Sequence, residues 1–296
     1  MHDTGLFISH LGLGDMILLL PAIVNCASNC KLLYIFSKNI YTDTIIHFLS
    51  SYNNIKIIEF DVQLNEQDII NNTIQYLINK HTNIYIYSSG YYNKNRNPFI
   101  DFPNHFYKDL SLDFNYALNS YTIPITQHAI MLHALLKSLY KPYIFLHTQA
   151  SNLNLNIDID TTNTNVIIIN PEINMYTSEH IYYNIAQKFL RKENNHTLLD
   201  YKLVIENATA LHLIDSSYFC FAILCRPVIP IHKIVYSRYQ QPFKTLLNNT
   251  WTQYYCSTIP SSERDTRADA GIGGTIPSSE RDTRAGIYTS GTGSIQ

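Results

Sequence analysis

Short apolar runs alternate with amphipathic, helix-like segments along the first half of the chain. Near-continuous apolar runs separated by helices are typical of parallel strands in a sheet that is covered on both faces. The pattern therefore predicts an α/β fold that opens as strand, helix, strand. We expect strands at 6–10, 31–37, 55–60 and 83–87, and helices at 15–27, 41–51, 66–80, 104–114 and 125–140.

A second alternating series starts after Pro142. We expect its strands at 143–147, 166–170, 210–214 and 227–231, and its helices at 178–191, 198–208 and 216–224. Two such series predict two Rossmann-like lobes with parallel sheets and a cleft between them. The expected N-terminal lobe is 1–140 and the expected C-terminal lobe is 141–257, with a hinge at 137–142.

The composition changes abruptly at Thr258. Residues 258–268 recur letter for letter at 275–285. The whole segment 258–296 has few apolar side chains to bury, and such segments are expected to stay disordered. We interpret 258–296 as a low-complexity repeat tail, with a tethering arm as the functional alternative.

The charge balance argues against a nucleic-acid partner. The chain has 21 Lys and Arg against 23 Asp and Glu, so its net charge is −2 and no basic field is present to hold phosphates. The abundance of Asn, Ile and Tyr suggests an A/T-rich genome, such as that of a virus or an intracellular microbe.

No segment predicts export or a membrane span. The apolar run 16–24 has the length of a signal-peptide core, but no basic region precedes it and a polar glycine turn leads into it. No stretch reaches the ~20 apolar residues that a span requires. We therefore expect a cytoplasmic protein, in the host cytoplasm if it is viral, whose 5 scattered cysteines are buried structural thiols.

The turn after the first expected strand carries the first candidate chemistry. Gly12 and Gly14 let the backbone approach a ligand closely because they have no Cβ. Asp15 falls in the first turn of the next helix, where the helix dipole favours its charge. A carboxylate there faces the crevice at the carboxyl ends of the strands, so Asp15 is a candidate general base. His10 is placed to touch a substrate or to steady Asp15.

The second lobe offers a matching turn at Asp215, Ser216 and Ser217. The hydroxyls and helix amides of this turn suit a diphosphate, although simple capping of the helix explains the same residues. His147 and Thr148 end the first expected strand of this lobe, where donor phosphates would lie. A structural hydrogen bond is the other interpretation of His147.

Three further residues are candidates with plain alternatives. Glu206 either receives sugar hydroxyls or is an exposed helix carboxylate. Arg96 and His105, in and just after the irregular aromatic segment 88–103, either grip an acceptor or lie on the surface.

These residues resemble those of GT-B glycosyltransferases, in particular the heptosyltransferase-like group (family 9) and related viral and marine-bacterial proteins. The resemblance is carried by the opening strand, the turn 12–15 and the apolar run that ends in Pro21 and Ala22. Segments 102–107, 205–208 and 214–217 are also similar to parts of these proteins. The resemblance implies a GT-B fold, Asp15 as the base on an acceptor hydroxyl, and 214–217 as a donor-phosphate turn. That turn departs from the family in lacking the usual glycine and proline.

The resulting hypothesis is an inverting, metal-independent glycosyltransferase. It would use a nucleotide sugar as co-substrate and a glycan or another hydroxyl compound as acceptor, with no resident cofactor or metal. One alternative is a non-catalytic nucleotide- or carbohydrate-binding protein of the same fold. The other is a dinucleotide-dependent oxidoreductase, which is disfavoured because Ile17 stands where the dinucleotide motif has its third glycine.

Overall fold

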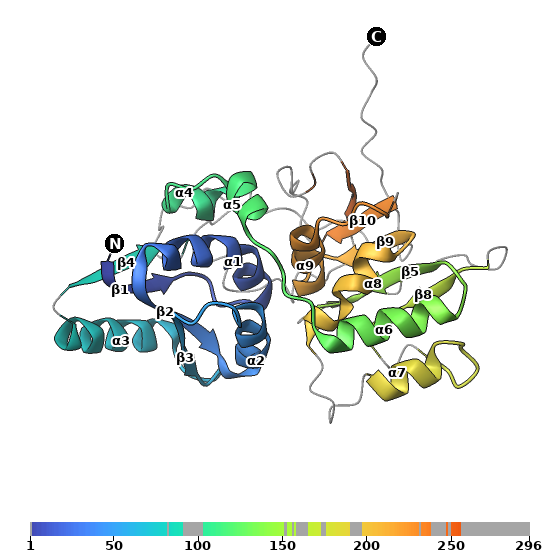
Figure 1. Cartoon of the computed structure of the whole chain (residues 1–296), viewed down its shortest axis with the longest axis horizontal. Coiled ribbons are helices and arrows are strands. Elements are labelled where there is room, and N and C mark those ends of the chain that lie inside the picture. The colour runs from blue at the N-terminus through green and yellow to red at the C-terminus, as the bar shows by residue number, and fades with distance from the viewer. Residues whose placement is uncertain are drawn as a thin grey trace, which may run out of the picture.

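A computed structural model of the chain contains two separate parallel sheets flanked by helices (Figure 1). The predicted α/β class with two parallel sheets is thereby confirmed. The tail at 258–296 and Arg96 lie outside the described residues, so the disorder expected for the tail stays a prediction. The structure describes residues 2–81, 83–90, 103–150, 153–155, 157, 165–172, 176–189, 197–230, 232–237, 247 and 250–255.

The first sheet has the strand order β3-β2-β1-β4, and all its pairs are parallel. Because β4 returns to pair with β1, the strand order reverses between β1 and β4, and open α/β sheets bind ligands at such a switch point. Its strands are β1 (His2–Ile8), β2 (Cys30–Lys38), β3 (Ile55–Phe60) and β4 (Ile84–Ser88). The helices of this region are α1 (Leu13–Ser28), α2 (Asn39–Phe48), α3 (Glu66–Lys80), α4 (Asn104–Asp109) and α5 (Phe114–Ser120).

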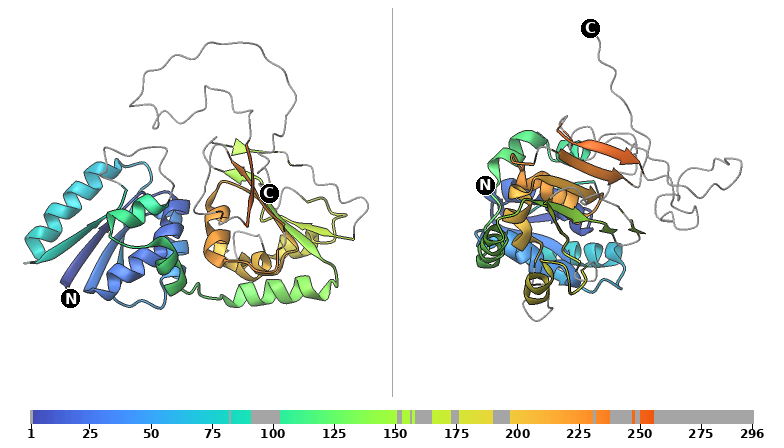
Figure 2. Two further views of the ribbon diagram at one scale, coloured as in Figure 1. Left: turned by 90° about the horizontal axis from the view of Figure 1, so that it is seen from above. Right: turned by 90° about the vertical axis from the view of Figure 1, so that its right-hand side faces the viewer.

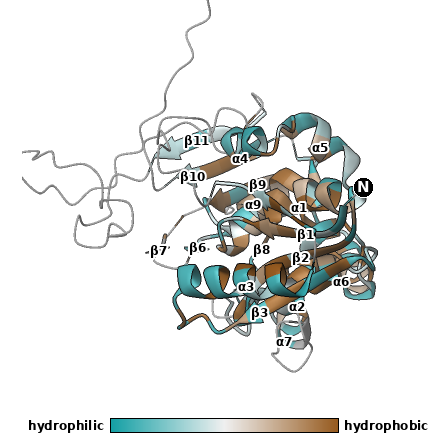
Figure 3. Ribbon diagram, turned by 90° about the vertical axis from the view of Figure 1, so that its left-hand side faces the viewer, coloured by the Kyte–Doolittle hydropathy of each residue, from teal (hydrophilic) through white to brown (hydrophobic). Residues whose placement is uncertain are grey.

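Helices α1 and α3 lie on opposite faces of this sheet (Figure 2). Every residue of α1 from Met16 to Ile23 is buried. One side of α1 packs on the first sheet, and the second lobe covers the other side. Helix α3 buries only Ile70 and Leu77, and its outer side is hydrophilic (Figure 3). The apolar run 16–24 is thus explained by a helix buried on all sides. None of the described helices is both long and apolar enough to cross a membrane.

The second sheet has the order β11-β10-β9-β5-β8 and is also parallel throughout. Its strand order reverses at β5, which lies between β8 and β9, so its switch point is at the carboxyl ends of β5 and β9. The strands are β5 (Tyr143–His147), β8 (Ile167–Ile169), β9 (Ala210–Ile214), β10 (His232–Ser237) and β11 (Thr252–Tyr255), beside a hairpin of β6 (Gln149–Ala150) and β7 (Leu153–Asn154). The helices are α6 (Gln127–Ser138), α7 (Tyr183–Phe189), the 3₁₀ helix η3 (Leu198–Tyr201), α8 (Lys202–Asn207) and α9 (Ser217–Cys225).

Two segments differ from the sequence predictions. The helix expected at 104–114 divides into α4 and α5 because the chain turns at Ser111, whose φ is 56°, and restarts at Asp113, which caps α5. The strand expected at 227–231 is wrong. Residues 227–230 form no strand, because Pro227 and Pro230 lack the amide hydrogen that a sheet ladder needs. The sheet continues with β10 and β11 instead.

The chain crosses between the lobes before α6. Helix α6 packs against η3 and α8, and its N-cap Thr126 donates a hydrogen bond from Oγ1 to Asp200 Oδ1 at 2.6 Å. Helix α6, which the predicted division at residues 140 and 141 assigns to the first lobe, therefore has these contacts with the second.

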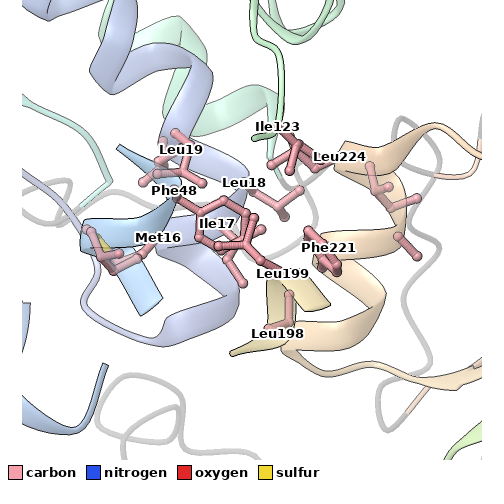
Figure 4. Close-up of a cluster of buried hydrophobic side chains, with 14 of the residues drawn as sticks. Met16, Ile17, Leu18, Leu19, Phe48, Ile123, Leu198, Leu199, Phe221 and Leu224 are labelled. Atoms are coloured by element: carbon pink, nitrogen blue, oxygen red, sulfur yellow. The ribbon is translucent and has the colours of Figure 1, made fainter. Parts of the chain in front are cut away.

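A continuous apolar interface between α1 and α9 joins the lobes. Ile17 and Leu18 of α1 lie beside Phe221 and Leu224 of α9 (Figure 4). The Phe48 ring of α2 meets the Phe221 ring edge-on, with centroids 5.6 Å apart. All of these side chains are buried, so the hydrophobic core runs from one lobe into the other.

Candidate active site between the two sheets

Asp15 lies in the first turn of α1, just after the carboxyl end of β1, and we call the switch point between β1 and β4 the first crevice. Helix α1 begins at Leu13, with Gly12 as its N-cap in an extended conformation. The Asp15 side chain turns back over Gly12, because a Cβ added at Gly12 would lie 3.0 Å from Asp15 Oδ2. Asp15 is partly exposed. Gly12 thus leaves room for a carboxylate that a ligand in the crevice can reach.

His10 is held beside this crevice by an aromatic contact. Its ring stacks on the Phe106 ring with centroids 5.2 Å apart. Phe106 is fixed in turn, because Ser89 Oγ donates to its carbonyl at 3.0 Å and the Gly90 amide donates to Asp109 Oδ2 at 2.8 Å. Gly90 has φ +67°, and a Cβ there would come within 2.2 Å of the Phe106 ring. Only glycine fits this junction, which positions His10.

Of the two predicted acceptor residues, the structure describes His105. It lies in the first turn of α4, beside Phe106, and is partly exposed. Phe106, its neighbour in the chain, carries the ring on which His10 stacks. The acceptor role of His105 stays a prediction, as does that of Arg96.

We call the switch point at the carboxyl ends of β5 and β9 the second crevice; His147, which ends β5, lies there and is 3% exposed. Its Nδ1 lies 3.1 Å from Ser216 Oγ, and its ring packs on the Tyr218 ring with centroids 4.4 Å apart. Ser216 is the N-cap of α9, yet its side chain makes no cap hydrogen bond. Burial lowers the pKa of His147 to about 4. His147 is therefore neutral near pH 7. The Ser216 hydroxyl is hydrogen-bonded to His147, whereas the capping interpretation predicts a bond to an amide of α9.

The second crevice contains two residues that the sequence predictions missed, Asn170 and Glu172. Glu172 Oε1 lies 3.9 Å from His147 Nε2, and burial raises the pKa of Glu172. Thr148 Oγ1 and Asn170 Nδ2 are buried without a hydrogen-bond partner among the described residues. Buried polar atoms without partners call for an explanation, and a bound ligand is one. Asn170 directly follows the apolar strand β8, and Glu172 comes two residues later. A polar residue at the end of an apolar strand is the same pattern that identified His147.

Glu206 and Asp215 have different surroundings from those expected. Glu206 precedes β9, so it lies near the amino ends of the strands, roughly 16 Å from their carboxyl ends for a strand of this length. Its Oε1 accepts a hydrogen bond from Lys202 Nζ at 2.7 Å. The structure therefore places Glu206 away from His147, as a paired helix carboxylate. Asp215 is only 6% exposed, and its amide donates to the Tyr236 carbonyl at 3.1 Å.

The two crevices adjoin where α1 and α9 begin. A Cβ added at Gly14 would lie 3.1 Å from Cys220 Sγ and 3.7 Å from Ser217 Cα. The first turns of the two helices are therefore in contact, and the missing side chain of Gly14 permits it. Asp15 and Ser216, the neighbours of these two residues in the chain, lie on adjoining turns of different lobes.

This arrangement combines a carboxylate with hydrogen-bond donors from opposite sides. The first lobe contributes Asp15 and His10, and the second contributes the start of α9, the Ser216 hydroxyl and the orphaned Thr148 hydroxyl. Helix N-termini favour anions through their amides and dipole. Among the residues that the structure describes, no group of three or more His, Cys, Asp or Glu side chains is placed to hold a metal ion.

Comparisons with known proteins give structural similarities at low sequence identity. No protein-family model matches the sequence, and no curated protein matches it. A glycosyl transferase family 9 structure from Veillonella parvula is similar over 81% of this chain and 82% of its own, at 10% identity and a TM-score of 0.48. The E. coli ADP-heptose lps heptosyltransferase II is similar over 86% and 91%, at 9% and 0.46. E. coli heptosyltransferase WaaC with ADP-2-deoxy-2-fluoro heptose is similar over 88% and 94%, at 11% and 0.40.

Proposed function

We propose that this chain transfers a sugar from a nucleotide-activated donor to an acceptor hydroxyl. The observation that carries the proposal is the contact between the first turns of α1 and α9 at Gly14 and Ser217. This contact brings a partly exposed carboxylate of one lobe next to a polar, anion-favouring helix start of the other. The resemblance of the turn 12–15 to the opening motif of family 9 transferases supports the same proposal.

In the proposed reaction, Asp15 removes the proton of the acceptor hydroxyl. The acceptor oxygen forms a bond to the anomeric carbon of the donor sugar, and the bond from that carbon to the diphosphate oxygen breaks. Attack from the face opposite the leaving group inverts the anomeric centre. The charge that develops on the diphosphate is stabilised by the α9 amides and by the hydroxyls of Ser216 and Thr148. Charge stabilisation by these groups needs no metal ion.

Neutral His147 has a positioning role in this proposal. Its Nδ1 is 3.1 Å from the Ser216 hydroxyl. If Nδ1 is unprotonated, the Ser216 hydroxyl donates its hydrogen to His147, and only the hydroxyl oxygen is available to a ligand. With Nδ1 protonated, the hydroxyl instead accepts from His147 and turns its own hydrogen outward. The second tautomer suits a diphosphate, because it presents a hydrogen-bond donor to the anion.

A nucleotide-release assay with UDP-, GDP-, ADP- and CMP-linked sugars tests the proposal. One of these donors, with an added acceptor, is expected to release nucleotide with the unmodified protein, and Asp15→Asn is expected to lower the rate by about 100-fold or more, a typical contribution of a general base. Asp68→Asn is the matched control, because Asp68 also lies in the first turn of a helix, α3, and is exposed. It should leave the rate unchanged.

The same assay separates the enzyme from the alternatives. A protein that binds a nucleotide sugar but releases no nucleotide with any acceptor would be the binding protein of the second hypothesis. Binding of a nicotinamide dinucleotide alone would support the oxidoreductase. A chelator is expected to leave the transfer rate unchanged, and its loss on chelation would contradict metal-independent transfer.

A further inference from the structure

A second hollow lies at the opposite end of α9 from Ser216 and Ser217. It has a volume of about 540 Å³ and is lined by α5 of the first lobe and by the end of α9, the start of β10 and Trp251 of the second. Pockets for small molecules typically span ~300–1,000 Å³, so the hollow has room for one. It is separate from the candidate active site, which adjoins the start of α9.

Two cations line this hollow. Arg226 directly follows α9, and its Nη1 donates to Asn119 Oδ1 of the first lobe at 2.6 Å, which leaves other donors of the guanidinium for a ligand. Lys233 lies in β10 and is partly buried, and burial lowers its pKa. No carboxylate is among the described residues that line the hollow. Glu206 is close enough to the end of α9 to affect Cys225 electrostatically, but it is paired with Lys202 at 2.7 Å.

The rest of the lining combines apolar and aromatic side chains with the polar Asn115, Asn119 and Thr250. Phe114 of α5 and the half-buried Trp251 contribute rings, and Trp251 meets Phe219 edge-on with centroids 5.4 Å apart. A partly desolvated ammonium that has no acidic partner among the described residues has an electrostatic cost that an anion would offset. The apolar surface beside it favours a ligand that also carries a flat, apolar group.

We propose that this hollow binds a small organic phosphate, a phosphomonoester attached to a ring. The phosphate contacts Lys233 and Arg226, and the ring lies against the partly exposed Trp251. Because α5 belongs to the first lobe and the cations to the second, the bound ligand contacts both lobes. The site is remote from the crevices where transfer is proposed to occur.

Trp251 makes the proposal directly measurable, because it is the only tryptophan among the 296 residues. Phenyl phosphate is titrated into the full chain, with excitation at the red edge of indole absorption to avoid the tyrosines. A saturable change in emission is expected with phenyl phosphate, a weaker one with inorganic phosphate, and none with phenol. The absence of a saturable change with phenyl phosphate would overturn the proposal.

Variants locate the signal in the hollow. Lys233→Gln and Arg226→Gln are each expected to weaken binding about tenfold, the usual effect of losing a charge-assisted hydrogen bond. Lys31→Gln removes an exposed cation that pairs with Asp3 far from α9 and should change nothing. Ser216→Ala should also leave the titration unchanged. Binding that survives both Lys233→Gln and Arg226→Gln, or that is lost in Ser216→Ala, would contradict the proposal. Circular dichroism of each variant checks that it is folded.

Discussion

The backbone of Gly14 lies against that of Ser217, close enough that a Cβ on Gly14 would be 3.7 Å from Ser217 Cα. One residue begins a helix of the first sheet and the other begins a helix of the second. Through this contact, the helices that follow the switch points of two separate sheets meet at their first turns. The candidate active site is therefore a property of the interface and not of either lobe alone.

Substitution at Gly14 should loosen this contact. In Gly14→Ala the new methyl group lies 3.1 Å from Cys220 Sγ, so the helices must separate slightly, and we expect a loss of about 1 kcal/mol in the free energy of unfolding. Urea denaturation measures it. Adding Cys220→Ala removes the sulfur, so the double variant should match Cys220→Ala alone. A double variant that keeps the full loss would show that the contact is not the cause.

Gly90→Ala should be more damaging. The residue must adopt φ +67° and place a Cβ 2.2 Å from the Phe106 ring, so strain and displacement of Phe106 together should cost about 2–4 kcal/mol. Measured against Phe106→Leu alone, Gly90→Ala should cost less than it does in the unmodified protein, because the smaller side chain relieves part of the steric conflict while the backbone strain remains. If Gly90→Ala is as stable as the unmodified protein, the assignment of this junction is wrong.

Thr148→Val separates ligand binding from stability. Thr148 Oγ1 is buried without a partner among the described residues, so the isosteric change should leave the free energy of unfolding equal or higher. If this hydroxyl binds the donor, affinity for the nucleotide sugar should fall about tenfold by calorimetry. Thr42→Val is the matched control, because Thr42 Oγ1 donates to the Lys38 carbonyl at 3.1 Å. It should lose about 1 kcal/mol of stability and no affinity.

Charge neutralisation at two carboxylates distinguishes the two ends of the second sheet. Glu172→Gln should strengthen nucleotide-sugar binding, because it removes a carboxylate 3.9 Å from His147, where the anionic diphosphate is proposed to lie. Glu206→Gln should leave binding unchanged, since Glu206 is paired with Lys202 near the amino ends of the strands. Isothermal titration of both variants with the same donor is the measurement, and weaker binding in Glu206→Gln would support Glu206 as a donor-binding residue.

Stability should fall with acidification between about pH 6.5 and pH 4. Burial lowers the pKa of His147 to about 4 from its usual 6.5, so the unfolded chain binds a proton in this range that the folded chain does not. Each pH unit then removes up to about 1.4 kcal/mol, for a total of about 3 kcal/mol from this residue. His212, whose pKa burial also lowers to about 4, adds to the slope.

Urea denaturation at pH 7, 6 and 5 measures this slope. His147→Gln should flatten it in part, because the His212 contribution remains. His47→Gln, which replaces an exposed histidine, is expected to keep the full slope. An unchanged slope in His147→Gln would contradict the assigned protonation state.

The local sequence was sufficient for elements whose stability comes from their own apolar pattern. The observed bounds of β3, α3, β5 and β9 are those that the pattern predicts. The pattern failed at β11, where Thr252–Tyr255 is short and polar, and it predicts the helix α6 without specifying that this helix packs against η3 and α8. These outcomes depend on contacts between distant parts of the chain.

The candidate site was predictable to the same extent. Asp15, His147 and Ser216 follow strands, so the rule on carboxyl ends finds them. The hydrogen bond between Ser216 and His147 was not predictable, since it joins residues 69 apart in the chain. It replaces the local cap that a serine at a helix start usually makes. Glu206 precedes its strand and pairs with Lys202 near the amino ends of the strands, so its donor-binding role stays a prediction.

The shared core between α1 and α9 also determines how the molecule denatures. Phe48 and Phe221 lie in one buried cluster, although their helices α2 and α9 pack on different sheets. Neither sheet can lose its partner without exposing the apolar side of α1, so calorimetry should record a single cooperative melting peak for both. A half-molecule expressed on its own should then be insoluble or unfolded.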